Sequence, residues 1–167
     1  MVARDADPPV PAAASPRQPV MAMSVDVEEY FQVQAFAPIV PRADWDRWPS
    51  RVEANTERLL ELLEATGARA TFFVLGCVAE KHPGVVRRIA AAGHEIGSHG
   101  MSHTMLTELT PDQVRIELRD SRRLLEDLCG SRVEGYRAPS YTISPDTRWA
   151  LDLLDPAPAQ EIGRAHV

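Results

Sequence analysis

The sequence is poor in lysine and cysteine and has no long apolar run. Lys81 is the only lysine among 18 basic residues, a skew that we attribute to a GC-rich genome. Cys77 and Cys129 form no C-x-x-C pair and lie in apolar-rich segments. This predicts two buried thiols in a reducing compartment, with a single disulfide as the alternative. No stretch is long or apolar enough to cross a membrane.

Length and charge favour one soluble domain. The chain has 167 residues, 44% of them hydrophobic, which is enough to build a packed core. The formal net charge of −6 argues against nucleic acid or a membrane surface as a partner, because both are polyanionic. The sequence leaves the oligomeric state open.

The first twenty residues differ from the rest in composition. Residues 1–20 are rich in proline, alanine and charge, and they lack the apolar core of a signal peptide. We therefore expect a disordered leader, with Met21 or Met23 as alternative translation starts. The missing signal peptide leads us to expect a cytoplasmic protein.

Apolar periodicity indicates four strands separated by helices. The predicted strands cover 20–27, 70–75, 94–98 and 133–137, and the predicted helices cover 50–67, 83–92, 110–130 and 144–154. Capping boxes are expected at Ser50 with Glu53 and at Thr110 with Gln113. Strands separated by helices of this length imply an α/β fold with a parallel sheet. Ligands of such folds bind at the carboxyl ends of the strands.

Three acids lie at the end of the first predicted strand. Asp26 and Glu28 are two residues apart, so their side chains face the same side of an extended chain. One carboxylate can then hold a metal ion while the other acts as a base towards water. Glu29 points away in this arrangement, unless a bend reverses the choice. Solvated acids at a strand end are the alternative interpretation.

His99 and His103 follow the third predicted strand. Two neutral imidazoles four residues apart can converge on one cation, and strand-end carboxylates complete a His, His, carboxylate set. A divalent cation bound there lowers the pKa of water and polarises a carbonyl. We interpret His94 and His82 as structural, and ordinary surface histidines are the alternative for the pair.

Arg137 ends the fourth predicted strand, two residues before Pro139. Its guanidinium can hold a catalytic carboxylate by a two-pronged hydrogen bond, and the alternative is a structural ion pair. Pro139 fixes a turn that can present the backbone N–H of Ser140 to an oxyanion. Because Asp26, His99 and Arg137 all fall at strand ends, the pattern favours a hydrolytic site at one edge of the sheet.

Taken together, these segments resemble the polysaccharide deacetylases with a NodB homology domain, carbohydrate esterase family 4. The matching segments are SVDVEEYFQV, RVEANTERLLELLEATGARATFFVLG, HEIGSHGMSH and GYRAPSY, and the likeness extends from about residue 22 to about residue 154. More closely, they resemble the bacterial branch associated with exosortase-linked exopolysaccharide loci. The resemblance implies a distorted (β/α) barrel, of which about four βα units are present, and a metal-dependent N-deacetylase.

The resemblance also implies a role for each candidate residue. Asp26 matches the family's catalytic base, Arg137 matches the arginine that orients it, and the Ser140 N–H matches an oxyanion donor. Three residues match the metal ligands, for which Zn²⁺ is the usual cation: Glu28, His99 and His103. The implied substrate is an N-acetylated polysaccharide or oligosaccharide, whose N-acetylhexosamine units lose acetate.

The first motif departs from the commonest family pattern, which has two adjacent Asp residues. Here Val27 separates Asp26 from Glu28. The same spacing occurs in the branch that contains allantoinase-like cyclic-amide hydrolases, so this activity is the alternative. The metal-binding acid stays open between Asp26 and Glu28.

The C-terminal end departs further. The family's later motifs, one with Asp and Trp and one Leu-x-x-His that bears the general acid, are absent from this sequence. Residues 161–167, EIGRAHV, are what a widely used sequencing adapter would encode in one frame, so we expect 155–167 to be a non-native tail. We interpret 21–154 as the N-terminal part of a deacetylase domain, inactive in isolation. A non-catalytic carbohydrate- or metal-binding remnant is the alternative.

Overall fold

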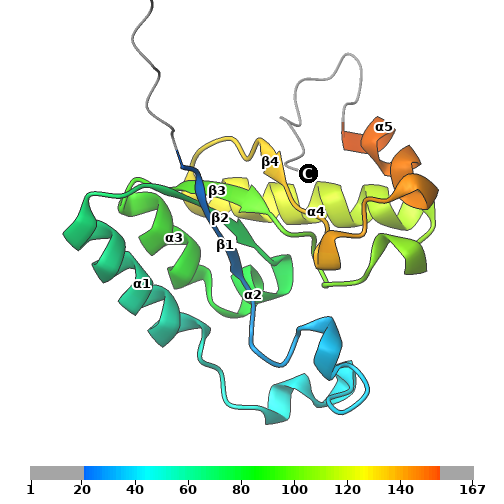
Figure 1. The fold of residues 1–167 in the computed structure, drawn as a ribbon, viewed down its shortest axis with the longest axis horizontal. Helices are drawn as coiled ribbons and strands as arrows, with labels where there is room; N and C mark the ends of the chain where they lie inside the picture. The colour runs from blue at the N-terminus through cyan, green and yellow to red at the C-terminus, as the bar shows by residue number, and fades with distance from the viewer. Residues whose placement is uncertain (1–20, 155–167) are drawn as a thin grey trace, which may run out of the picture.

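A computed structural model describes residues 21–154, which form an α/β fold around one parallel sheet (Figure 1). The predicted leader, 1–20, and the predicted tail, 155–167, lie outside the described residues. The sheet contains β1 (Met23–Val27), β2 (Ala70–Val74), β3 (Glu95–Ser98) and β4 (Gly135–Tyr136). Each strand pairs in parallel with the next one along the chain, which confirms the predicted succession of βαβ units.

Helices connect the strands within the described part of the chain. The α-helices are α1 (Val52–Thr66), α2 (Gly76–Lys81), α3 (Pro83–Ala91), α4 (Pro111–Cys129) and α5 (Leu151–Leu154). The 3-10 helices are η1 (Gln34–Phe36), η2 (Arg42–Arg47), η3 (Leu106–Glu108), η4 (Pro139–Tyr141) and η5 (Pro145–Ala150). Among residues 21–154, no helix has the length and apolar character needed to cross a membrane.

Three of the predicted helices correspond to α1, α3 and α4. Helix α2 was not predicted, because its six residues directly follow β2 and are too few to show an apolar period. The helix predicted over 144–154 is in fact the 3-10 helix η5 followed by the short helix α5.

Helix α4 begins at the predicted capping box. The Gln113 N–H donates to Thr110 Oγ1 (3.3 Å), and the Thr110 N–H donates to Gln113 Oε1 (2.8 Å). Gly130 ends the helix at φ 70°, a left-handed conformation that a Cβ disfavours. Four residues on one face of the helix are buried: Val114, Leu118, Ser121 and Leu125.

The predicted capping box at Ser50 is wrong. Helix α1 begins after Arg51, which makes no side-chain capping bond. The buried carboxylate of Glu29 takes that place, because it accepts the Arg51 N–H (3.0 Å) and the Ser50 hydroxyl. Glu53, the expected partner of Ser50, pairs with Arg88 instead (3.4 Å). A carboxylate at a helix N-terminus makes charge-assisted hydrogen bonds, and the positive end of the helix dipole stabilises its negative charge.

One face of the sheet packs against the helices. It carries Val27, Phe72 and Ile96, and Figure 1 shows α1 and α3 beside each other next to the strands. Helical side chains fill this core from α1 (Val52, Leu60, Leu63), α3 (Val85, Val86, Ile89) and α4 (Leu125). A second apolar cluster joins α4 to η3, β4 and α5: Leu106, Val114, Leu118, Tyr136 and Leu154. Burial of each such large side chain stabilises the fold by about 1.5–3 kcal/mol.

The two cysteines are free thiols. Cys77 and Cys129 are each half-buried. Burial raises the pKa of the Cys77 thiol, so this group stays protonated at neutral pH. The single disulfide considered as an alternative is therefore absent from residues 21–154.

The opposite face of the sheet leads to the candidate site. Asp26 pairs with Phe73, Phe73 with Gly97, and Gly97 with Gly135. A Cβ added at Gly97 would stand 2.6 Å from the Phe73 ring, and one at Gly135 would stand 3.3 Å from it. The ring is 1% exposed, so the two glycines provide the space in which it is buried.

Gly97→Ala is expected to destabilise the chain by about 1–3 kcal/mol, because the added methyl overpacks the Phe73 ring. Urea unfolding of the purified chain measures this change. Gly84→Ala in α3 is the matched control: its Cβ meets only the flexible end of Arg88, at 3.2 Å. The control is expected to keep or raise stability, by up to about 1 kcal/mol. Equal stability of the two variants would contradict the proposed role of Gly97.

Candidate metal centre

Three strands end where the candidate site begins. Each strand is followed directly by a candidate residue: β1 by Glu28, β3 by His99 and β4 by Arg137. Because the strands are parallel, these residues leave the sheet at the same edge. The structure thus brings Asp26, Glu28, His99 and Arg137 together from segments that are far apart in the sequence.

Glu28, His99 and His103 form a cluster of metal-ligand type. Each offers one ligand atom, and these atoms lie within 4.8 Å of one another. The two histidines are 2% and 5% exposed, and their ring centroids are 5.5 Å apart. Two imidazole nitrogens with one carboxylate oxygen are a donor set that Zn²⁺ and similar divalent cations accept, with coordination positions left for water or substrate.

One buried atom tests whether this cluster fits a cation. Glu28 Oε2 lies 3.0 Å from His103 Nε2, yet it makes no hydrogen bond within the described residues. A buried carboxylate oxygen without a hydrogen bond is costly, and a cation shared with the imidazoles removes that cost. The residues therefore fit a divalent cation.

A backbone contact orients His99. Its Nδ1 lies 2.8 Å from the carbonyl oxygen of Arg137, so the Nδ1–H donates there and Nε2 is left for a metal. Burial lowers the pKa of His99, which favours the neutral imidazole that coordination requires.

Asp26 and Arg137 form an ion pair beside the cluster. Arg137 Nη1 donates to Asp26 Oδ1 (2.6 Å), and Arg137 Nη2 donates to Ser24 Oγ (2.8 Å). The prediction of a two-pronged bond to one carboxylate is therefore wrong, because the fork is divided between Asp26 and Ser24. The guanidinium carbon also lies 4.1 Å from the centre of the Phe73 ring and 5.7 Å from that of Tyr141.

Ser140 lies in a strained turn next to this ion pair. It is exposed and has φ 53°, and Tyr141 also has φ 53°. Left-handed backbone at residues with a Cβ persists only where the surroundings hold it, and it is commonest at functional sites. The Tyr141 N–H donates to the Ala138 carbonyl (3.0 Å), which closes the turn. The role of the Ser140 N–H as an oxyanion donor stays a prediction.

Several residues of the site escaped the sequence reasoning. Ser24 lies two residues before Asp26 on the same strand face, a spacing that could have identified it. Phe73 was treated only as part of a strand. A cavity of about 170 Å³ also adjoins His103, and its lining includes Arg42 and Glu108 from outside the strands. No local pattern links these two residues to His103.

Comparisons with known proteins identify the family of this chain. Residues 44–156 match the profile of the family described as polysaccharide deacetylase, and the chain belongs to this family. A peptidoglycan-N-acetylglucosamine deacetylase of Bacillus cereus is 35% identical over 98 residues, which make up 58% of this chain and 36% of that protein. A chitooligosaccharide deacetylase of Bradyrhizobium is 30% identical over 99 residues, which make up 59% of this chain and 43% of that protein.

The solved structure of the peptidoglycan deacetylase PdaC from Bacillus subtilis has the same fold. It superposes with a TM-score of 0.62 at 24% identity and covers 92% of this chain and 60% of that chain. The described residues are thus part of a NodB-type (β/α) barrel, as predicted. The chain spans less than half the length of the two curated relatives above.

Glu28→Gln is expected to weaken Zn²⁺ binding by roughly 100-fold or more, because it removes a charged ligand. Asp26→Asn is the matched control, and it is expected to change the affinity by less than about tenfold, since Asp26 is held by Arg137 outside the ligand cluster. Isothermal titration of the purified chain with Zn²⁺ measures both. A larger loss for Asp26→Asn would make Asp26 the metal-binding acid.

Proposed function

We propose that this chain carries the metal-binding and base-bearing part of an N-deacetylase that acts on N-acetylhexosamine units of a bacterial polysaccharide. The observation that carries the proposal is the cluster of Glu28, His99 and His103 beside the Asp26–Arg137 ion pair. The family and the activities of the relatives support it. Because the chain spans only part of those relatives, the activity belongs to the proposal.

The residues on either side of the cluster have complementary tasks. When bound, a divalent cation lowers the pKa of water and polarises the amide carbonyl. Asp26 accepts a proton from the attacking water. Because Arg137 Nη1 donates to its Oδ1, the accepting atom is Oδ2. Arg137 keeps that carboxylate oriented. The Ser140 N–H donates to the oxyanion that develops on the amide.

The polymer is proposed from the sequence segments alone. The likeness of SVDVEEYFQV and HEIGSHGMSH to the exosortase-linked branch favours an exopolysaccharide as the substrate. The same Asp26-Val27-Glu28 spacing favours a second candidate, a cyclic-amide hydrolase. Both reactions open an amide with activated water, so only the substrate separates them.

Acetate release from N-acetylated chito-oligosaccharides in the presence of Zn²⁺ tests the proposal, with the product of the native gene as the enzyme. Asp26→Asn is expected to lower kcat by about 10²–10⁴-fold with a small change in KM, because it removes the base and leaves the ligands intact. Asp120→Asn, a carboxylate on the surface of α4, is the control and is expected to leave kcat unchanged.

Other outcomes would replace the proposal. Ring opening of cyclic ureides without acetate release would assign the chain to the cyclic-amide hydrolases. Glycan binding without either reaction would identify a non-catalytic carbohydrate-binding remnant.

A further inference from the structure

We propose that Glu117 of α4 is a positioning residue for the metal centre. Its carboxylate holds the loop between His99 and His103 in the shape that directs both imidazoles at one cation. The inference rests on the proposed function, because it takes the cluster of Glu28, His99 and His103 as the cation site.

The contacts of Glu117 are concentrated on the middle of this loop. Glu117 Oε2 accepts the N–H of Met101 (2.7 Å) and the N–H of Ser102 (3.0 Å), and Oε1 accepts the Ser102 hydroxyl (2.5 Å). Hydrogen bonds to an ionised carboxylate are about twice as strong as those between neutral groups. One side chain thus fixes two consecutive amides that lie between the two histidines.

The loop needs such support because its backbone is strained. Gly100 has φ 82° and His103 has φ 57°, and His103 carries a Cβ that disfavours this conformation. A strained residue keeps its shape only where surrounding contacts determine it. If the loop relaxed, the imidazole of His103 would move relative to that of His99, and the ligand atoms would no longer converge.

Backbone amides of helix α2 bind the carbonyl groups of the same loop. The Gly76 N–H donates to the Gly100 carbonyl (2.9 Å), and the Cys77 N–H donates to the Met101 carbonyl (2.8 Å). The first amides of α2 and the carboxylate of Glu117 therefore bind complementary groups of the loop. Glu117 contributes the side-chain part of this support, which substitution can remove.

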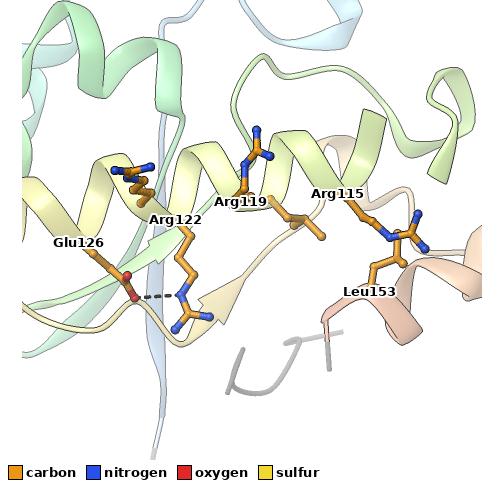
Figure 2. A pocket seen from close by; sticks show the side chains of 7 residues that line it. Arg115, Arg119, Arg122, Glu126 and Leu153 are labelled. Atoms are coloured by element: carbon orange, nitrogen blue, oxygen red, sulfur yellow. Dashed lines mark hydrogen bonds and ion pairs between the residues drawn. The ribbon is translucent and has the colours of Figure 1, made fainter. Parts of the chain in front are cut away.

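Glu126 offers a matched control on the same helix. It accepts the Val133 N–H (3.0 Å) and pairs with Arg122 (2.9 Å), and Figure 2 shows this pair on α4. Glu126 thus ties α4 to the segment before β4, whereas Glu117 ties α4 to the segment between the metal ligands. Both are glutamates that bind backbone amides. If metal binding depended only on general stability, substituting either glutamate would weaken it alike.

The test measures Zn²⁺ affinity and the d–d absorption of bound Co²⁺ for the purified chain and its variants. Glu117→Gln keeps the size of the side chain but places an amide group among backbone donors. It is expected to raise the Kd for Zn²⁺ by about 10–100-fold and to change the Co²⁺ spectrum, as the loss of a supporting contact behind a ligand does. Glu126→Gln is expected to leave the Kd for Zn²⁺ within about twofold of the wild-type value, even if its Tm falls as much as that of Glu117→Gln.

Ser102→Ala keeps the test valid if Glu117→Gln does not fold. It removes the hydroxyl bond to Glu117 together with the contact to Thr104 Oγ1 (2.8 Å), keeps both backbone bonds to Glu117, and is expected to give a smaller rise in Kd. The positioning role would be overturned by wild-type affinity and spectrum in Glu117→Gln, or by equal losses in Glu117→Gln and Glu126→Gln. The cation site itself would still stand if Glu28→Gln weakened Zn²⁺ binding as expected. If the wild-type chain bound no Zn²⁺, this result would contradict both the proposed cation site and the positioning role of Glu117.

Discussion

Parallel pairing of the four strands is the constraint on which the candidate site depends. It places the ends of β1, β3 and β4 at one edge of the sheet, so that Glu28, His99 and Arg137 leave the sheet close together. The register matters as much as the order. A slip of one residue in β1 would turn Asp26 towards the helix-covered face and bring an apolar neighbour, Val25 or Val27, to the site.

The Phe73 ring connects this sheet to the chemistry of the site. It lies across Gly97 and Gly135, and the guanidinium carbon of Arg137 lies 4.1 Å from its centre. A cation over an aromatic face is stabilised by about 0.5–2 kcal/mol. Arg137 Nε is buried without a hydrogen-bond partner among residues 21–154, so the ring and the two Nη bonds hold the guanidinium in place. The side chain that fills the space above the two glycines therefore also aligns the arginine with Asp26.

Much of this arrangement is predictable from the sequence, because it rests on local patterns. Apolar periods predict the strands and the three long helices, and Thr110 caps α4 as expected because its partner is three residues away. The predictions fail where the partner is distant. The Ser50 hydroxyl bonds to Glu29, 21 positions earlier, and Arg137 shares its fork with Ser24, 113 positions away. Helix α2 is missed for another reason, since six residues are too few to show a period.

Strained backbone and a buried oxygen without a hydrogen bond also occur at this edge of the sheet among residues 21–154. The residues with a Cβ and positive φ in the described part of the chain are His103, in the loop after β3, and Ser140 and Tyr141, in η4 after β4. Within residues 21–154, a buried oxygen of Glu28 has no hydrogen bond, although His103 Nε2 lies 3.0 Å from it. Folds retain strain and unpaired buried groups where function requires them. A hydrogen bond from His103 would satisfy Glu28 alone, whereas a divalent cation would bind both imidazoles and the carboxylate together, as the proposed function requires.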